Sequence, residues 1–167
     1  KILEKITNLS GINFFGVNTS KTKGIDLGSI WTISTFNDNN WNAGKGIFGY
    51  GMDNISTQLD FGLQEQNKII TYYFRKSFEL TSLNSINSLK LSVLRDDGIA
   101  VYLNGNLVVR NNLPEEFDYL TLAQESVPAA DQQNYIHYSV DAEFLVLGKN
   151  TIAVEVHQAN AESSDLG

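Results

Sequence analysis

The chain has 167 residues, of which 12 are Lys or Arg and 19 are Asp or Glu, giving a formal net charge of −7 at pH 7. This length fits one domain with a core large enough to stabilise it. The absence of cysteine excludes a disulfide framework, a thiolate metal site and a cysteine nucleophile, and two histidines are too few for a multi-histidine metal centre. The acidic charge argues against nucleic acid, and no apolar run is long enough to span a membrane.

Apolar and polar residues alternate along much of the chain, which is the pattern of half-buried β-strands. The composition of 12–15 favours an edge strand. Asn104-Gly105 is a dipeptide typical of a type I′ hairpin turn, and 148–150 marks another chain reversal. The alternating segments are 69–80, 89–93, 99–109, 135–140 and 151–157.

Helical periodicity is scarce, and only 142–147 and 82–88 have the composition of a helical turn. Strands that follow one another without intervening helices predict an all-β fold, an antiparallel β-sandwich. Three long polar stretches separate the strands, at 36–55, 111–134 and 158–165. Long loops in compact domains often carry function, so we expect the functional residues there.

Four segments of the chain carry a family resemblance: FNDNNWNAGKGIFGYG at 36–51, TYYFRKSFEL at 71–80, RDDGIAVYLNG at 95–105 and GKNTIAVEVHQANAESSDLG at 148–167. They resemble jelly-roll modules of secreted bacterial multidomain proteins, which have the galactose-binding-domain-like fold. The sugar-binding domain of family 2 glycoside hydrolases is similar in its hairpin ending with Asn-Gly and in its Gly-x-Asn turn before a hydrophobic strand. The resemblance implies a jelly-roll β-sandwich similar to carbohydrate-binding modules, although one fold hosts many functions.

We expect 1–167 to form a single β-sandwich domain of a longer polypeptide, because the sequence begins without an initiator Met and stops after an apparent strand start. The segment 1–30 matches no part of the resemblance. In such modules the loop at 163–165 precedes another strand, so the resemblance implies a final strand after Gly167.

Two groups of polar residues at strand ends are candidates for ligand binding. Arg95, Asp96 and Asp97 directly follow a strand. Their carboxylates can accept hydrogen bonds from sugar hydroxyls or bind a hard cation, and the Arg can hold an anionic group. Because Asp-Gly is a common turn dipeptide, a turn role is the alternative. The second group is His157, Gln158, Asn160, Ser164 and Asp165.

The second group lies where the corresponding loop of family 2 glycoside hydrolases reaches toward the sugar, so the resemblance implies that it faces the ligand. Amide and hydroxyl groups suit polyols because each can donate and accept hydrogen bonds. His157 lies on the strand face opposite Ile152 and Val154. Packing beneath a loop is therefore the alternative for this histidine.

Aromatic side chains are candidates for stacking against sugar rings. Trp41 lies between two asparagines and is the better candidate for stacking on a sugar ring. The alternative is that its ring is buried and covers the end of the sandwich. Trp31 lies in a strand-like run at 30–33 and is expected in the core. Tyr73 and Arg75 share one strand face, which is either a concave binding surface or a second buried layer.

The resemblance implies one structural Ca²⁺, but the sequence does not identify its ligands. Asp38 or Asp26 could contribute to a calcium loop, although neither has EF-hand spacing. For catalysis, the sequence has no nucleophile elbow, phosphate loop or zinc signature. The acidic cluster at 115–118 is better explained as a loop, so we expect no active site.

These observations lead to the hypothesis of a non-catalytic carbohydrate-binding module. It would bind a polysaccharide and target an attached enzyme to it, outside a bacterial cell. The alternative is a structural, spacer or protein-interaction domain that braces an adjacent domain of the parent protein. A polar cleft would favour the first hypothesis, and a large apolar surface would favour the second.

Overall fold

A computed structural model describes residues 12–14, 24–84 and 86–167, and in this part of the chain the fold is all-β, as predicted. The paired strands are antiparallel except for one short parallel pair, β3 with β4. The elements are β1 (Ile12–Phe14), η1 (Ile30–Thr32), β2 (Asn42–Gly44), β3 (Phe48–Gly49), β4 (Thr57–Gln58), β5 (Thr71–Leu80), β6 (Ser88–Val93), β7 (Gly98–Leu103), β8 (Asn106–Asn111), β9 (Ile136–Asp141), η2 (Ala142–Phe144) and β10 (Gly148–His157).

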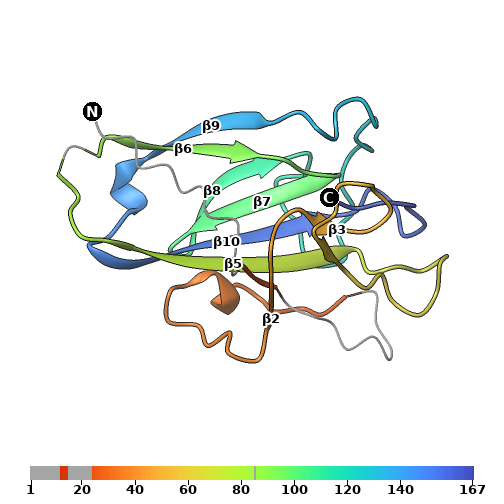
Figure 1. The fold of residues 1–167 in the computed structure, drawn as a ribbon, viewed down its shortest axis with the longest axis horizontal. Helices are drawn as coiled ribbons and strands as arrows, with labels where there is room; N and C mark the ends of the chain where they lie inside the picture. The colour runs from red at the N-terminus through yellow and green to blue at the C-terminus, as the bar shows by residue number, and fades with distance from the viewer. Residues whose placement is uncertain (1–11, 15–23, 85) are drawn as a thin grey trace.

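The largest sheet has six strands in the order β2-β1-β5-β10-β7-β8, and the β6–β9 pair forms a separate layer over one of its faces (Figure 1). Strand β10 lies inside this sheet and pairs with β5 along its whole length, from Gly148 opposite Leu80 to His157 opposite Thr71. Its other edge pairs with β7. The predicted antiparallel β-sandwich is therefore confirmed.

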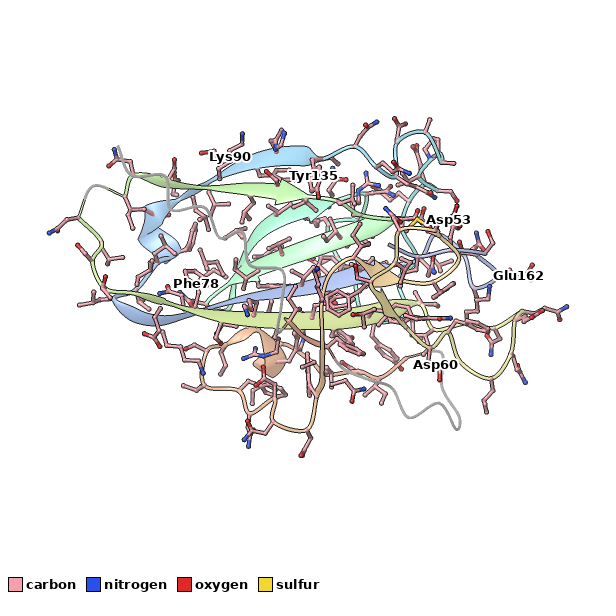
Figure 2. The ribbon with its side chains drawn as sticks, in the orientation of Figure 1. Asp53, Asp60, Phe78, Lys90, Tyr135 and Glu162 are labelled. Carbon is pink, nitrogen blue, oxygen red and sulfur yellow. The ribbon has the colours of Figure 1, made fainter. Side chains whose placement is uncertain are left out.

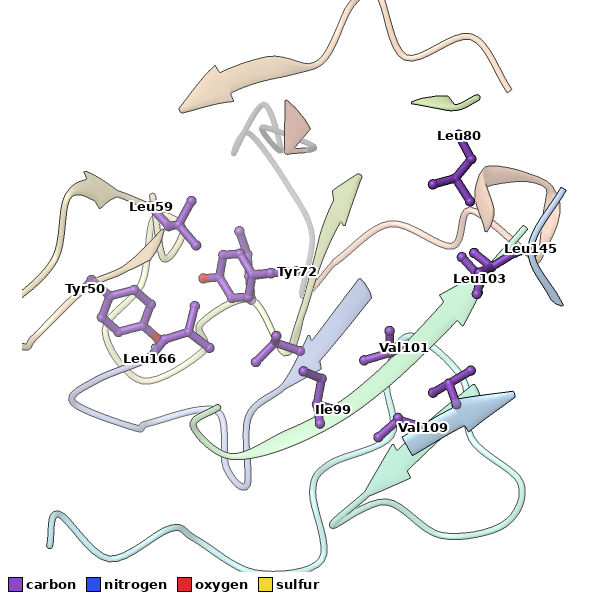
Figure 3. Close-up of a cluster of buried hydrophobic side chains, with 13 residues drawn as sticks. Tyr50, Leu59, Tyr72, Leu80, Ile99, Val101, Leu103, Val109, Leu145 and Leu166 are labelled. Carbon is purple, nitrogen blue, oxygen red and sulfur yellow. The ribbon is translucent and has the colours of Figure 1, made fainter. Parts of the chain in front are cut away.

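The main core lies between the large sheet and the β6–β9 pair (Figure 3). Alternate residues of each strand point into it, as the period-2 pattern predicted. Tyr72 from β5, Val101 from β7 and Val156 from β10 are buried there, and Val140 of β9 belongs to the same cluster. Leu166 joins the core through its side chain, and its backbone forms a bridge with Tyr50.

The opposite face of the large sheet is also covered, by the segment that contains η1. Trp31 is buried there against Tyr73, with ring centroids 4.8 Å apart, and Ala153 completes the contact. The expectation that Trp31 lies in the core is correct, but it is carried by a 3₁₀ turn and not by a strand. One buried face, as predicted for β5, holds only for its later part, where Ser77 and Glu79 are exposed. In its first part, this segment covers Tyr73 and Arg75 on the second face.

Two asparagines connect the β7–β8 hairpin to the start of β10. Asn104 and Gly105 both have positive φ, 52° and 90°, as the predicted type I′ turn requires. The Asn104 Nδ2 donates to Asn150 Oδ1 at 2.8 Å, and its Oδ1 accepts the Thr151 N–H at 2.9 Å. The Asn150 side chain is fully buried and also bonds both backbone groups of Val146.

The remaining expectations concern helical turns and loops. A 3₁₀ turn covers only 142–144 of the segment 142–147, and the described residues of 82–88 contain no helix. In the described part of the chain, no helix is long and apolar enough to cross a membrane.

Side chains of Asp53, Asp60 and Glu162 lie toward one end of the sandwich, where several loops meet (Figure 2). The single-domain assignment of 1–167 and a strand after it stay predictions. Most of 1–30 lies outside the described residues.

We expect Asn150→Ala to lower the free energy of unfolding by about 2–3 kcal/mol, because it leaves buried backbone groups without partners. Urea denaturation measures this change. Asn106→Ala is the matched control on the same hairpin, since Asn106 is exposed and its side-chain contacts are 3.4 and 3.5 Å long. The control should stay within about 0.5 kcal/mol of the wild type. Equal stability of the two variants would contradict the role given to Asn150.

Candidate functional site at the loop end of the sandwich

Three loops meet at the end of the sandwich where β10 finishes, and the Asp97 side chain holds them together. Its carboxylate is buried and accepts two backbone hydrogen bonds, from Val127 N–H to Oδ1 and from Ala159 N–H to Oδ2, both at 2.7 Å. These donors belong to the segments 124–134 and 158–165. Asp97 therefore fixes the position of both loops relative to the start of β7.

A side-chain amide joins two carboxylates beside this anchor. The Gln132 Nε2 donates to Asp96 Oδ2 at 3.2 Å and to Asp165 Oδ2 at 3.0 Å. The Asp165 Oδ1 in turn accepts hydrogen bonds of 3.3 Å from Ser163 and Ser164. We name Asp96, Gln132, Ser164 and Asp165 the loop-end cluster. It places hydrogen-bond donors and acceptors from three loops next to one another.

The Asp96 carboxyl has an unusual protonation behaviour. Burial, followed by the nearby Asp97 and Asp165 carboxylates, raises the pKa of Asp96 to about 7. The side chain is only 3% exposed, so its charged form is poorly solvated. Near neutral pH it can therefore act as a hydrogen-bond donor or as an acceptor.

Buried side chains support the loop-end cluster from below. Gln158 is fully buried, and its Nε2 donates to Tyr50 Oη at 2.6 Å and to the Asp165 carbonyl at 3.0 Å. The Lys68 Nζ donates to the Ser163 carbonyl at 2.5 Å and lies 5.5 Å from the centre of the Tyr50 ring. Both side chains hold the 158–165 loop against the core.

The other predicted residues near this end have different environments. The Arg95 Nε donates to Asn111 Oδ1 at 2.7 Å. Asn160 is exposed, and its Oδ1 accepts the Glu162 N–H at 2.9 Å in a local turn. The structure thus brings Asp96, Ser164 and Asp165 together as part of one cluster, with Asn160 exposed on the same loop.

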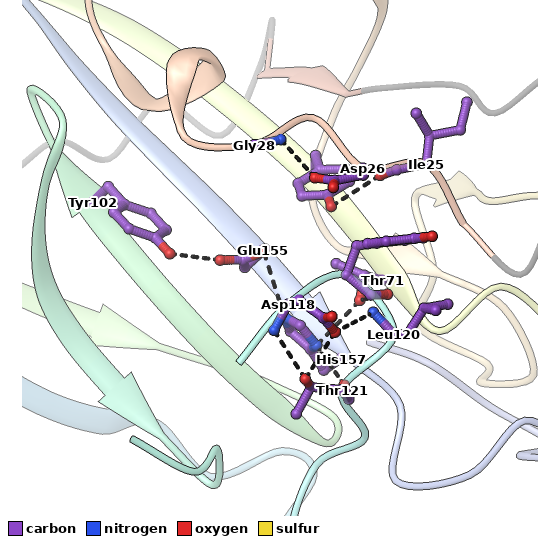
Figure 4. A network of polar contacts seen from close by, with 12 residues as sticks. Ile25, Asp26, Gly28, Thr71, Tyr102, Asp118, Leu120, Thr121, Glu155 and His157 are labelled. Carbon is purple, nitrogen blue, oxygen red and sulfur yellow. Dashed lines mark hydrogen bonds and ion pairs between the residues drawn. The ribbon is translucent and has the colours of Figure 1, made fainter. Parts of the chain in front are cut away.

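His157 and Gln158 are completely buried, so the expectation that they face a ligand is corrected. The His157 Nδ1 lies 2.7 Å from the Thr121 carbonyl oxygen and 3.1 Å from Thr71 Oγ1 (Figure 4). The ring therefore packs beneath the 117–121 segment, which is the alternative that the sequence left open. Asp97 is likewise an internal anchor, because both of its oxygens accept backbone hydrogen bonds.

Tyr73 and Arg75 lie in the second buried layer and do not line a concave binding surface. They are 3% and 2% exposed. The Tyr73 Oη donates to the Ile25 carbonyl at 3.1 Å. The Arg75 guanidinium pairs with Asp38 at 2.8 Å and also donates to the Trp31 carbonyl. Burial under the η1 segment is the reason why the predicted ligand contacts do not apply.

Trp41 belongs to the same layer and is half-buried. Its ring stacks on Trp31 at a centroid distance of 6.5 Å and an angle of 28°, and Phe36 meets it edge-on at 5.8 Å. It is therefore part of an aromatic cluster over the sheet. Its remaining exposed surface keeps the predicted stacking on a sugar open.

Sequence reasoning missed Gln132, which joins the cluster. The predicted functional loop at 111–134 contains it, but no local signal separates it from the neighbouring Gln133. Only the meeting of three loops distinguishes the two residues, since Gln133 is exposed and Gln132 contacts Asp96 and Asp165.

The predicted calcium ion has no matching ligand set among the described residues. No three Asp, Glu or His side chains in this part of the chain are grouped to hold a metal ion. Asp38 pairs with Arg75, and Asp26 Oδ1 accepts the Gly28 N–H at 2.8 Å. The loop-end cluster presents an N–H group where calcium needs oxygen ligands. A calcium site therefore stays a prediction without identified ligands.

An apolar groove of about 650 Å³ opens between the two sheets. Leu91 of β6 and Ile152 and Val154 of β10 line it, and all three remain only half-buried. Lys76 and Lys90 also line the groove, whereas none of its described lining residues is acidic. This feature is physically different from the polar loop-end cluster.

No protein-family model and no curated protein matches the sequence. Solved structures that match in fold include a β-glycosidase from Bacteroides vulgatus, with a TM-score of 0.53, 19% identity, and coverage of 90% of this chain and 17% of that one. A β-glucuronidase from Bacteroides uniformis gives a TM-score of 0.54 and 16% identity, covering 91% of this chain and 14% of that one. A family 2 glycosyl hydrolase from Bacteroides cellulosilyticus gives a TM-score of 0.53 and 12% identity, covering 89% of this chain and 17% of that one.

These identities are low, so the likeness concerns the fold alone. The chain spans less than a fifth of the length of these three glycosidases. The resemblance predicted from the sequence, to a small β-sandwich domain of family 2 glycoside hydrolases, is confirmed at the level of the fold.

We expect the contribution of Asp96 to stability to fall as the pH rises from about 4 to 7, because its carboxyl ionises in the unfolded state but stays protonated in the folded state. Its pKa is raised from 3.8 to about 7 on folding, so the folded state binds more protons in this window. In the wild type, Asp96 lowers the free energy of unfolding by up to about 1.4 kcal/mol per pH unit in this window. Asp96→Asn, which mimics the protonated form, should abolish this decrease. Urea denaturation at a series of pH values measures this slope. An unchanged slope would refute the assignment, and Asp53→Asn is a control at an exposed carboxylate.

Trp41→Ala should lower the free energy of unfolding by about 2 kcal/mol, because it removes half-buried ring contacts with Trp31 and Phe36. Thermal and urea unfolding test this expectation. A variant with wild-type stability would show that the ring contributes little to the second layer, and it would return Trp41 to the role of an exposed platform.

Proposed function

We propose that this chain is a non-catalytic, secreted module that binds a polysaccharide and holds an attached enzyme near it. Binding takes place at the loop-end cluster. The observation that carries the proposal is the Gln132 amide, which bridges the Asp96 and Asp165 carboxylates at the meeting point of three loops. Glycosidases with the same fold in a small part of their length also support a carbohydrate-related role.

The chemistry of the cluster suits sugar hydroxyls. The half-buried Asp165 carboxylate accepts hydrogen bonds, and the Gln132 amide and the Ser164 hydroxyl both donate and accept. Asp96 is buried and supports Gln132 from below. Ser164 is exposed, whereas Asp97, Gln158 and Lys68 fix the loops from below without reaching the ligand. A small, shallow site of this kind gives affinities in the micromolar to millimolar range.

Among the acidic residues at 115–118, the Asp118 carboxylate is occupied by hydrogen bonds within its own turn. Asp118 Oδ1 accepts the Leu120 N–H at 2.9 Å and the Thr121 hydroxyl at 3.0 Å, and these bonds lower the pKa of Asp118. A carboxylate that caps its own turn and stays ionised is not a general acid. Glu115 and Glu116 are exposed on the same loop.

We expect a polysaccharide from a panel of neutral, uronic and sulfated polymers to retard the wild-type protein in affinity gel electrophoresis. Gln132→Ala should weaken this binding about tenfold, since it removes the hydrogen bonds that organise two carboxylates. Gln133→Ala is the matched control and should bind as the wild type does. Repeating the gels with EDTA tests whether a bound metal contributes.

Thermal unfolding of each variant separates a loss of binding from a loss of fold. Should Gln132→Ala unfold, the exposed Ser164→Ala gives the same test with less risk to stability. Binding that is equal in the wild type, Gln132→Ala and Ser164→Ala would exclude the loop-end cluster as the site.

A second candidate function is a bracing or interaction domain, and the apolar groove favours it. Leu91, Ile152 and Val154 belong to the core pattern but remain half-buried along the groove. Contact with an adjacent domain would remove this apolar surface from water. Absence of retardation by every polymer in the panel would favour this second function.

A further inference from the structure

The apolar groove between the two sheets contains a feature that polysaccharide binding does not use, the second edge of β6. Among the strands that the structure describes, β6 pairs with β9 alone, along one of its edges. Every second residue of such a strand directs its backbone N–H and C=O groups away from the partner strand. These groups are able to pair with a further strand.

The second edge of β6 faces the groove. Six consecutive residues, Leu89 to Leu94, line the groove. The side chains of a strand alternate between its two faces, so a strand that presented only one face would contribute every second residue. A run of consecutive residues therefore indicates that the groove follows the backbone edge of β6.

The floor of the groove is apolar and incompletely covered. Phe74 of β5 and Ile152 and Val154 of β10 line it, and the same side chains pack against the main core. All three stay half-buried although they lie on the core-facing side of their strands. Alternate residues of one added strand would point toward them, so its apolar side chains would remove this surface from water.

Positive charge borders the groove. Leu89 and Leu91 pack against the core, so Lys90 between them lies on the outer face of β6, where it is exposed. Lys76 also lines the groove, and none of the described lining residues is acidic. Because the whole chain has a net charge of −7, this positive border is a local feature. A strand beside β6 would place an outward side chain next to Lys90, where a carboxylate makes a favourable cross-strand pair.

We propose that an adjacent domain of a longer parent protein docks in this groove by adding one extended strand to the second edge of β6. The apolar side chains of that strand cover Phe74, Ile152 and Val154, and the acidic side chains that alternate with them lie beside Lys90. Backbone pairing supplies the affinity, and the alternation of side chains supplies the specificity. The inference rests on the second candidate function, contact with an adjacent domain, and not on polysaccharide binding.

A six-residue peptide of alternating valine and glutamate is the probe, because it matches the length of β6 and the alternation that the groove requires. We expect isothermal titration calorimetry to give a dissociation constant in the micromolar range. A peptide of alternating serine and glutamate lacks the apolar side chains and should bind at least about tenfold more weakly. N-methylation of the valine–glutamate peptide backbone removes its hydrogen-bond donors and should weaken binding by at least about tenfold.

Hydrogen exchange followed by NMR locates the bound peptide. Saturating peptide should raise the protection factors of the β6 amides about tenfold, because their N–H groups become part of a strand pairing. The β8 amides are the internal control. Strand β8 also lies at the edge of a sheet, but none of its residues lines the groove, so its protection should not change.

Reversing one charge tests the specificity. Lys90→Glu should weaken binding of the valine–glutamate peptide about fivefold and strengthen binding of a valine–lysine peptide by a similar factor. Lys90 is exposed, so the substitution leaves the core intact. Lys149→Glu, at an exposed lysine of β10 outside the groove, is the matched control and should bind both peptides as the wild type does.

Several results would overturn this docking site. One is the absence of binding by the valine–glutamate peptide, and another is equal binding of its N-methylated form, which excludes strand addition. A third is protection of the β6 amides without peptide. In a monomer it would show that the chain itself fills the groove, and in a dimer detected by analytical ultracentrifugation it would show that a second copy does.

Affinity gels of the peptide-saturated protein keep this test separate from the polysaccharide proposal. Retardation by a polysaccharide depends on the loop-end cluster, so saturating peptide should leave it unchanged. Peptide binding without retardation would support the docking site alone, and retardation without peptide binding would overturn the docking site alone.

Discussion

The structure depends on the central position of β10 and on the burial of its polar residues Asn150, Thr151, Glu155 and His157. This strand pairs with β5 on one edge and β7 on the other, and side chains cover both of its faces. These buried polar side chains are shielded from water, so most of their polar atoms are paired within the protein. Asn150 does so at one end of the strand and His157 at the other, where each bonds backbone groups of a loop. The positions of these loops thus follow from the hydrogen bonds that the buried polar side chains of β10 require.

The same requirement separates the residues that build the loop end from those that a ligand can reach. The Asp97 carboxylate accepts hydrogen bonds from loop backbone, and the Gln158 amide donates to Tyr50. These two side chains therefore define the shape of this end of the sandwich. Gln132 and Asp165 lie above them and are only half-buried. This arrangement, with buried anchors below a small polar surface, is consistent with the weak recognition of hydroxyl groups that we propose.

Two surfaces of opposite character coexist in this fold. The loop-end cluster is polar and organised by carboxylates, whereas the groove between the sheets is apolar and bordered by Lys76 and Lys90. Each suits a different partner, a polyol in the first case and an apolar protein surface in the second. The two surfaces are compatible with the proposed function, because a domain that brought an enzyme to a polymer would also contact an adjacent domain.

The sequence by itself determined the strand pattern, because period-2 alternation follows directly from strand geometry. It also determined the type I′ turn at Asn104-Gly105, because few residues tolerate positive φ. It could not show that the η1 segment covers Tyr73 and Arg75, since a strand face reads the same whether water or another segment lies over it. Tertiary structure alone decided that Asp97 and His157 are internal anchors and that Gln132 joins two carboxylates. These roles arise from contacts between loops distant in the sequence, for which no local pattern exists.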